Sequence, residues 1–92
     1  MPKTERTLQF HNLVGLRIRI LEHPDNKLVG LSGIVVLETR NTFVIRGVDG
    51  KLRRVLKVGY FEFELPNGRS VILEGSKVTG RLEERIKRAR KL

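Results

Sequence analysis

The stretch Leu16-Arg17-Ile18-Arg19-Ile20 alternates aliphatic and basic side chains with a period of two. Successive side chains of a strand point to opposite faces, so this pattern predicts a half-buried strand with its arginines outward. The later stretch Tyr60–Glu64, with the sequence YFEFE, repeats the pattern with phenylalanines inward and glutamates outward. Together the two stretches predict a sheet with one apolar face and one charged face.

Four further strands are predicted from short alternating or β-branched runs. They are Leu31–Glu38 with a bulge or bend at Gly33, Thr42–Arg46, Lys51–Val58 and Ser70–Glu74. Asp49-Gly50 predicts a type I′ hairpin turn, in which both central residues need positive φ. Six short strands with tight turns predict a small antiparallel barrel, whose closure would remove the exposed sheet edges.

The two ends of the chain carry helical rather than strand patterns. Thr4–Leu13 weakly predicts a short helix. Arg81–Leu92 predicts a basic helix, with apolar residues on one face and two glutamates placed four positions before cations. The predicted organisation is one domain with an N-terminal segment over 1–13, a barrel over 14–76 and a basic C-terminal helix over 77–92.

The chain has 92 residues, with 19 Lys and Arg against 10 Asp and Glu, for a formal net charge of +9. This length excludes a nucleotide-binding domain joined to a substrate domain. The charge favours a polyanionic partner, with nucleic acid the first candidate and an anionic membrane the second. The absence of cysteine excludes disulfides and a thiolate zinc site. No signal peptide or apolar span is visible, so a cytoplasmic location is expected.

Over half of the net charge falls on residues 76–92, which hold seven cations and two acids. This excess is larger than a helix C-terminus needs and favours phosphate contacts. Arg17 and Arg19 share one predicted outer strand face, and Arg53, Arg54 and Lys57 cluster on another strand. Whether these strands are neighbours is left open by the sequence, and an isolated outward arginine can equally be solvated surface.

Recognition by base stacking and intrinsic catalysis are both poorly supported. Only 5% of residues are aromatic, and the alternation of Phe61 and Phe63 with glutamate favours a core position for both, which leaves Tyr60 open. Recognition of structured RNA by its phosphates and shape fits better. His11 and His23 have no partner at metal-ligand spacing, and no acid–base pair is apparent.

Five motifs, in order, resemble archaeal ribonuclease P protein component 1, which is related to a subunit of eukaryotic ribonuclease P and MRP. They are Asn12–Leu16, Val29–Val36, Glu38–Thr42 (ETRNT), Phe61–Phe63 and Gly80–Lys87. The resemblance covers about His11 to Arg88. Leu82 and Leu56 depart from it, because the family often has proline at both positions.

The resemblance implies an Sm-like barrel and a role in 5′-end maturation of transfer RNA precursors. It implies that the RNA subunit is the catalyst, with magnesium expected there and no cofactor or metal on this chain. The expected partners are ribonuclease P RNA, the zinc-ribbon protein component 4 and other ribonuclease P proteins. Neither a membrane nor a small-molecule substrate is expected, and no catalytic residue is expected on this chain.

The resemblance also matches Arg40, Lys57, Lys77, Arg81 and Arg85 to family cations that face RNA or a partner. With the strand and helix cations, the candidate RNA-binding residues are Arg17, Arg19, Arg40, Arg53, Arg54, Lys57, Lys77, Arg81, Arg85 and Arg88. The alternative hypothesis is a stand-alone nucleic-acid-binding barrel of the ribosomal or chromatin type, which the same charge would serve.

Overall fold

The structure is a computed structural model that describes the backbone of residues 7–90 and the side chains of residues 7–88. Within this part of the chain, six strands form one antiparallel sheet. The strands are β1 (Arg17–Glu22), β2 (Ser32–Glu38), β3 (Thr42–Gly47), β4 (Leu52–Leu56), β5 (Tyr60–Glu64) and β6 (Ser70–Glu74). The helical segments are the 3-10 turns η1 (Leu8–Phe10) and η2 (Asn26–Leu28) and the helices α1 (Gly75–Val78) and α2 (Leu82–Arg90).

The sheet order is β4-β3-β2-β1-β5-β6, so β1 pairs with a strand about forty residues later in the chain. This pairing joins the two alternating stretches, with Ile18 opposite Phe63 and Ile20 opposite Phe61. The inner faces of both strands therefore bury their apolar residues together. All six predicted strands are confirmed: β5 and β6 have the predicted bounds, and the ends of the other four strands differ from the prediction by at most two residues.

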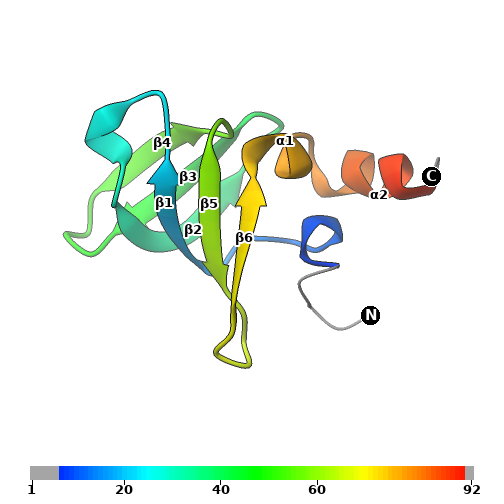
Figure 1. The fold of residues 1–92 in the computed structure, drawn as a ribbon, viewed down its shortest axis with the longest axis horizontal. Helices are drawn as coiled ribbons and strands as arrows, with labels where there is room; N and C mark the ends of the chain where they lie inside the picture. The colour runs from blue at the N-terminus through cyan, green and yellow to red at the C-terminus, as the bar shows by residue number, and fades with distance from the viewer. Residues whose placement is uncertain (1–6, 91–92) are drawn as a thin grey trace.

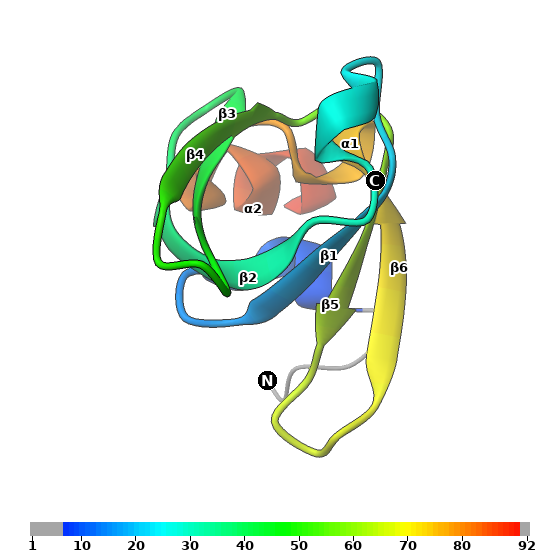
Figure 2. The same ribbon diagram turned by 90° about the vertical axis from the view of Figure 1, so that its left-hand side faces the viewer.

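The sheet curls through most of a barrel, as Figure 2 shows, but the predicted closure is wrong. Strands β4 and β6 do not pair and remain the two edges of the sheet. The start of α1 lies against the link between β4 and β5, since the Gly75 N–H donates to the Gly59 carbonyl at 2.8 Å. The approach is so close that a Cβ at Gly75 would lie 2.1 Å from the Lys57 carbonyl oxygen.

The inner face of the sheet forms an apolar core. Phe43 packs edge-to-face against Phe61 and Phe63, with ring centroids 5.5 and 5.9 Å apart. The inward orientation predicted for Phe61 and Phe63 is confirmed, because both are fully buried. Leu8, Leu13 and Val78 bring the terminal segments into the same cluster. The helical segments therefore extend the core beyond one end of the sheet (Figure 1).

The predicted bulge lies elsewhere on β2. Gly33 pairs regularly with Gly47, and glycine is required there because a Cβ would lie 2.2 Å from the Arg46 carbonyl oxygen. The register instead shifts between Val35 and Leu37. An extra residue in a strand reverses which face the following side chains reach. As a result Leu37 points outward and Glu38 points into the interior.

The hairpin predicted at Asp49-Gly50 is confirmed, but its turn type is different. Gly50 has φ of +79°, whereas no non-glycine residue in the described range has positive φ, so the turn is not type I′. The Gly50 N–H instead donates to the Gly47 carbonyl at 2.9 Å, and Gly50 then leads into β4.

The predicted terminal helices are shorter than expected. Of the N-terminal helix, the described part forms only η1, and Thr4–Arg6 lie outside the described residues. The C-terminal region forms two helices, because Gly80 adopts φ of +97° between them. Lys91 and Leu92 lie outside the described residues. Helix α2 contacts η1, so the two terminal regions meet beside one end of the sheet (Figure 1).

Candidate nucleic-acid interface

Three charged side chains form a buried charge cluster, which we define as Glu38, Lys57 and Arg85. The Lys57 Nζ lies 2.8 Å from Glu38 Oε1, and the Arg85 Nη1 bonds to the same carboxylate oxygen. Lys57 is 4% exposed and Arg85 is 1% exposed. One carboxylate therefore compensates two cations that are withdrawn from solvent, and backbone carbonyls must accept their remaining donors.

Those carbonyls belong to the segments that flank the sheet. Lys57 Nζ donates to the carbonyl of Val78 at 2.8 Å, and Arg85 Nη1 donates to that of Gly80 at 2.9 Å. Arg85 Nε and Nη2 donate to the carbonyls of Gln9 at 2.7 Å and His11 at 2.9 Å. The cluster thereby connects three segments to the sheet. They are α2, the link between α1 and α2, and the N-terminal region.

Burial also changes the acid–base behaviour of the cluster. Desolvation lowers the pKa of Lys57 below its ordinary value, and the neighbouring Glu38 carboxylate opposes this effect. The Lys57 ammonium also lies 5.0 Å from the centre of the Phe43 ring. Lys57 is thus bound by both polar and aromatic groups of the interior.

Lys57 and Arg85 were expected to face RNA, and their burial does not fit direct contact. Strand alternation from Val55 indicates that Lys57 points inward. A charged side chain is ordinarily expected at the surface, so the prediction from the sequence placed Lys57 there instead. Glu38 was not predicted as a functional residue, because the bulge that turns it inward has no clear sequence signature. We therefore treat these residues as part of the scaffold beneath the surface.

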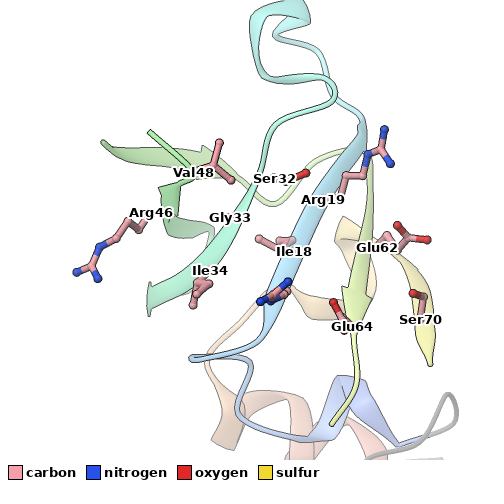
Figure 3. A pocket seen from close by; sticks show the side chains of 12 residues that line it. Ile18, Arg19, Ser32, Gly33, Ile34, Arg46, Val48, Glu62, Glu64 and Ser70 are labelled. Carbon is pink, nitrogen blue, oxygen red and sulfur yellow. The ribbon is translucent and has the colours of Figure 1, made fainter. Parts of the chain in front are cut away.

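The outer face of the sheet carries a second basic feature, the sheet groove, with a volume of about 430 Å³. Arg17, Arg19 and Arg46 contribute its cations, and Glu62 and Glu64 contribute two carboxylates. Figure 3 shows Ile18 and Ile34 between Arg46 on one side and Arg19 with the glutamates on the other. The groove is therefore mixed in character, because one side carries a cation and the other carries both a cation and two carboxylates.

The sheet order answers whether the basic strands are neighbours. Two strands separate β4 from β1, so Arg53 and Arg54 do not extend the row of Arg17 and Arg19. Arg46 of β3 joins the groove instead, because it lies opposite Ile34, which in turn lies opposite Arg17. Sequence reasoning missed Arg46, whose position in the sheet depends on the register.

The two arginines of β4 differ in their surroundings. Arg54 is exposed on the outer face opposite Val44. Arg53 donates to both oxygens of Asp49, at 3.2 and 2.8 Å. The Arg53 guanidinium beside Asp49, together with the Lys51 N–H, holds the pKa of that carboxyl well below its usual range. Arg53 is thus already neutralised locally, and Arg54 is not.

The remaining predicted cations lie near the helices. Lys77 of α1 and Arg81, just before α2, are exposed. Arg40 lies in the loop between β2 and β3, and its Nη2 is 3.3 Å from Glu84 Oε1. Among the described side chains, Glu84 therefore pairs with Arg40 rather than with Arg88, the partner that helical spacing predicted. Arg88 donates to the carbonyl of Thr79.

Features of other kinds of site are missing from the described part of the chain. No group of three or more His, Cys, Asp or Glu side chains is placed there to hold a metal ion. No helix in that part is long and apolar enough to cross a membrane.

The sequence left open whether Tyr60 could stack on a base. The Tyr60 hydroxyl donates to Glu74 at 3.2 Å, and this bond raises the pKa of Tyr60. A tyrosine held by a carboxylate is poorly placed to stack on an RNA base.

Comparison with known proteins identifies the group to which this arrangement belongs. The family model described as ribonuclease P/MRP, subunit p29, matches residues 6–88. The chain belongs to this p29 family. Ribonuclease P protein component 1 of Staphylothermus marinus is 48% identical over 95% of this chain and 96% of its own length. The corresponding protein of Hyperthermus butylicus is 44% identical over 100% of this chain and 84% of its own length.

A solved structure agrees with the p29 assignment. The structure of Mth11, a homologue of the human RNase P protein Rpp29, is 41% identical and has a TM-score of 0.60. The match covers 82% of this chain and 97% of that one. The resemblance seen in the sequence motifs is therefore confirmed, and the alternative of a stand-alone nucleic-acid-binding barrel is not favoured.

Proposed function

We propose that this chain is an RNA-binding subunit of ribonuclease P that assists a catalytic RNA in the 5′-end maturation of transfer RNA precursors. The observation that carries the proposal is the p29 family match, which spans nearly the whole chain. The curated relatives are ribonuclease P protein components. The net charge of +9 supports RNA as the binding partner.

The proposed RNA-contacting residues are the exposed cations among the sequence-predicted candidates, so they exclude the buried Lys57 and Arg85. Arg46 and Lys87 join the set. Arg46 lines the sheet groove and Lys87 lines a second pocket, and each pocket is also lined by residues predicted to bind RNA. Arg53 is left out, since Asp49 already binds its guanidinium. The set is Arg17, Arg19, Arg40, Arg46, Arg54, Lys77, Arg81, Lys87 and Arg88.

The proposal includes partners beyond the RNA. Other ribonuclease P proteins, among them the zinc-ribbon component 4, would assemble with this chain in the cytoplasm. Catalytic magnesium would be held by the RNA, and this chain would contribute no catalytic residue, metal ligand or small-molecule site. Its part in cleavage would be to bind and support the RNA.

Reconstitution with the cognate RNA and partner proteins tests this function. We expect the chain to raise the rate of precursor cleavage and to bind the RNA with a steep dependence on salt. Recovery of the complex from cells should yield a structured RNA and a zinc-ribbon protein. Unchanged cleavage together with salt-insensitive or absent RNA binding would overturn the proposal.

A further inference from the structure

A second hollow of about 280 Å³, the helix pocket, lies where three segments meet. The loop between β2 and β3 contributes Arg40, the link between the helices contributes Thr79 and Gly80, and α2 contributes three side chains. Those side chains are Glu84, Lys87 and Arg88. The lining thus holds three cations and one carboxylate, which favours an anionic ligand.

The backbone around the pocket is closely fitted. The Gly80 N–H donates to the Arg40 carbonyl at 2.6 Å, which joins the loop to the link between the helices. Gly80 has φ of +97°, and a Cβ there would lie 3.4 Å from the Glu84 Cβ. Glycine therefore permits the turn at this position, and a Cβ would be in ordinary contact with α2.

The buried charge cluster lies beneath all three walls. Glu38 is two residues before Arg40, and Arg85 lies on α2 between Glu84 and Lys87. Lys57 and Arg85 both bind the carbonyls of Val78 and Gly80, on either side of Thr79. The interior thus fixes the segments that carry the exposed cations, so the pocket is formed before a ligand arrives.

The ion pair between Glu84 and Arg40 is weak. The side chains of Arg40 and Glu84 are 66% and 37% exposed, and their atoms are 3.3 Å apart. Exposed ion pairs of this kind contribute little, and a phosphate oxygen can replace the carboxylate at the guanidinium. Lys87 makes no ion pair with the side chains of residues 7–88 and remains available.

We propose that the helix pocket binds a single phosphate group of the RNA backbone. Arg40 and Arg88 donate to the phosphate oxygens, Lys87 adds charge at the rim, and Glu84 turns away from Arg40. Glu84 therefore acts as a competitor that limits affinity until phosphate displaces it. This inference rests on the proposed RNA-binding function and assigns one contact within it.

The test measures affinity for the cognate RNA as a function of potassium chloride concentration. Arg40→Gln and Arg88→Gln should each weaken binding roughly three- to tenfold and lower the salt slope by about 0.7–0.9. The double variant should lower the slope by the same amount, since both side chains contact one phosphate. Lys27→Gln, which removes an exposed cation that does not line the pocket, is the matched control.

Glu84→Gln provides a result that misfolding cannot imitate, because it should tighten RNA binding about threefold. One outcome is that the wild type binds RNA with a steep salt slope while all pocket variants match Lys27→Gln in affinity and slope. That result would refute the phosphate site and leave the proposed function standing. If the double variant lowers the salt slope by twice the amount of a single variant, the two arginines do not share one phosphate. A wild type that does not bind RNA would instead refute the proposed function.

A nuclear magnetic resonance titration identifies the source of the phosphate. Inorganic phosphate should shift the Gly80 and Glu84 amide signals in the wild type but not in the double variant. A short RNA should shift the same signals at lower concentration. Shifts with inorganic phosphate but none with RNA would assign the pocket to free phosphate and overturn the RNA contact.

Discussion

Arg85 and Arg88 lie three residues apart in α2, yet they belong to different regions of the molecule. Arg85 is 1% exposed and donates to Glu38 and to backbone carbonyls of both terminal regions. Arg88 is exposed at the helix pocket. A count of cations treats them alike, whereas burial separates a residue that holds the fold from one whose guanidinium is exposed at the surface.

The largest expected effect follows from Glu38→Gln, which removes the only carboxylate of the buried charge cluster. Two buried cations would lose their counterion, and breaking such a network typically costs about 3–5 kcal/mol. Urea unfolding followed by circular dichroism measures the loss. Glu64→Gln, an exposed change of the same type, should alter stability by less than about 0.5 kcal/mol. Equal effects of the two changes would contradict a structural role for Glu38.

Replacing each arginine of α2 by lysine tests the comparison directly. Arg85→Lys keeps the charge but cannot reach Glu38, Gln9 and His11 together, so we expect a loss of about 2–3 kcal/mol in unfolding free energy. Arg88→Lys should cost less than about 1 kcal/mol and keep most of the RNA affinity. A larger stability loss at Arg88 than at Arg85 would reverse the assignment of the two residues.

A smaller effect distinguishes free from neutralised arginines on the sheet. Arg46→Gln should lower the salt slope of RNA binding by about 0.7–0.9 and weaken affinity severalfold. Arg53→Gln should change either quantity much less, because Asp49 already binds its guanidinium. The measurement is a salt titration with each variant. Equal losses would mean that RNA replaces Asp49 at Arg53.

The smallest effect concerns acid stability at the β3–β4 turn. Because the folded-state pKa of Asp49 is lowered, its carboxylate stabilises the fold above its ordinary pKa of 3.8 and loses that contribution as pH falls. Asp49→Asn should therefore reduce stability at neutral pH, and its difference from the wild type should shrink between about pH 5 and pH 2. Thermal unfolding across that range checks this, and a constant difference would refute it.

Sequence patterns predicted the strands and the inward phenylalanines, because strand periodicity depends on neighbouring residues alone. They did not predict the pairing of β1 with β5, the open edges or the bulge at Val36, which depend on distant contacts. The burial of Arg85 follows from such distant contacts, whereas the inward direction of Lys57 is indicated by the local alternation from Val55. The exposed cations Arg17 and Arg19 were placed correctly on an outer face, because the alternation of a strand depends on neighbouring residues alone.

The bonds of Arg85 also have a consequence for the order of folding. Its partners Glu38, His11 and Gln9 lie 47, 74 and 76 residues earlier in the chain. Contacts over such separations form slowly, since closing so long a loop costs conformational entropy before the contact is gained. During synthesis Glu38 and Lys57 emerge well before Arg85, so the cluster is incomplete until α2 has been made. Closing it is therefore a late folding event that brings together both terminal regions.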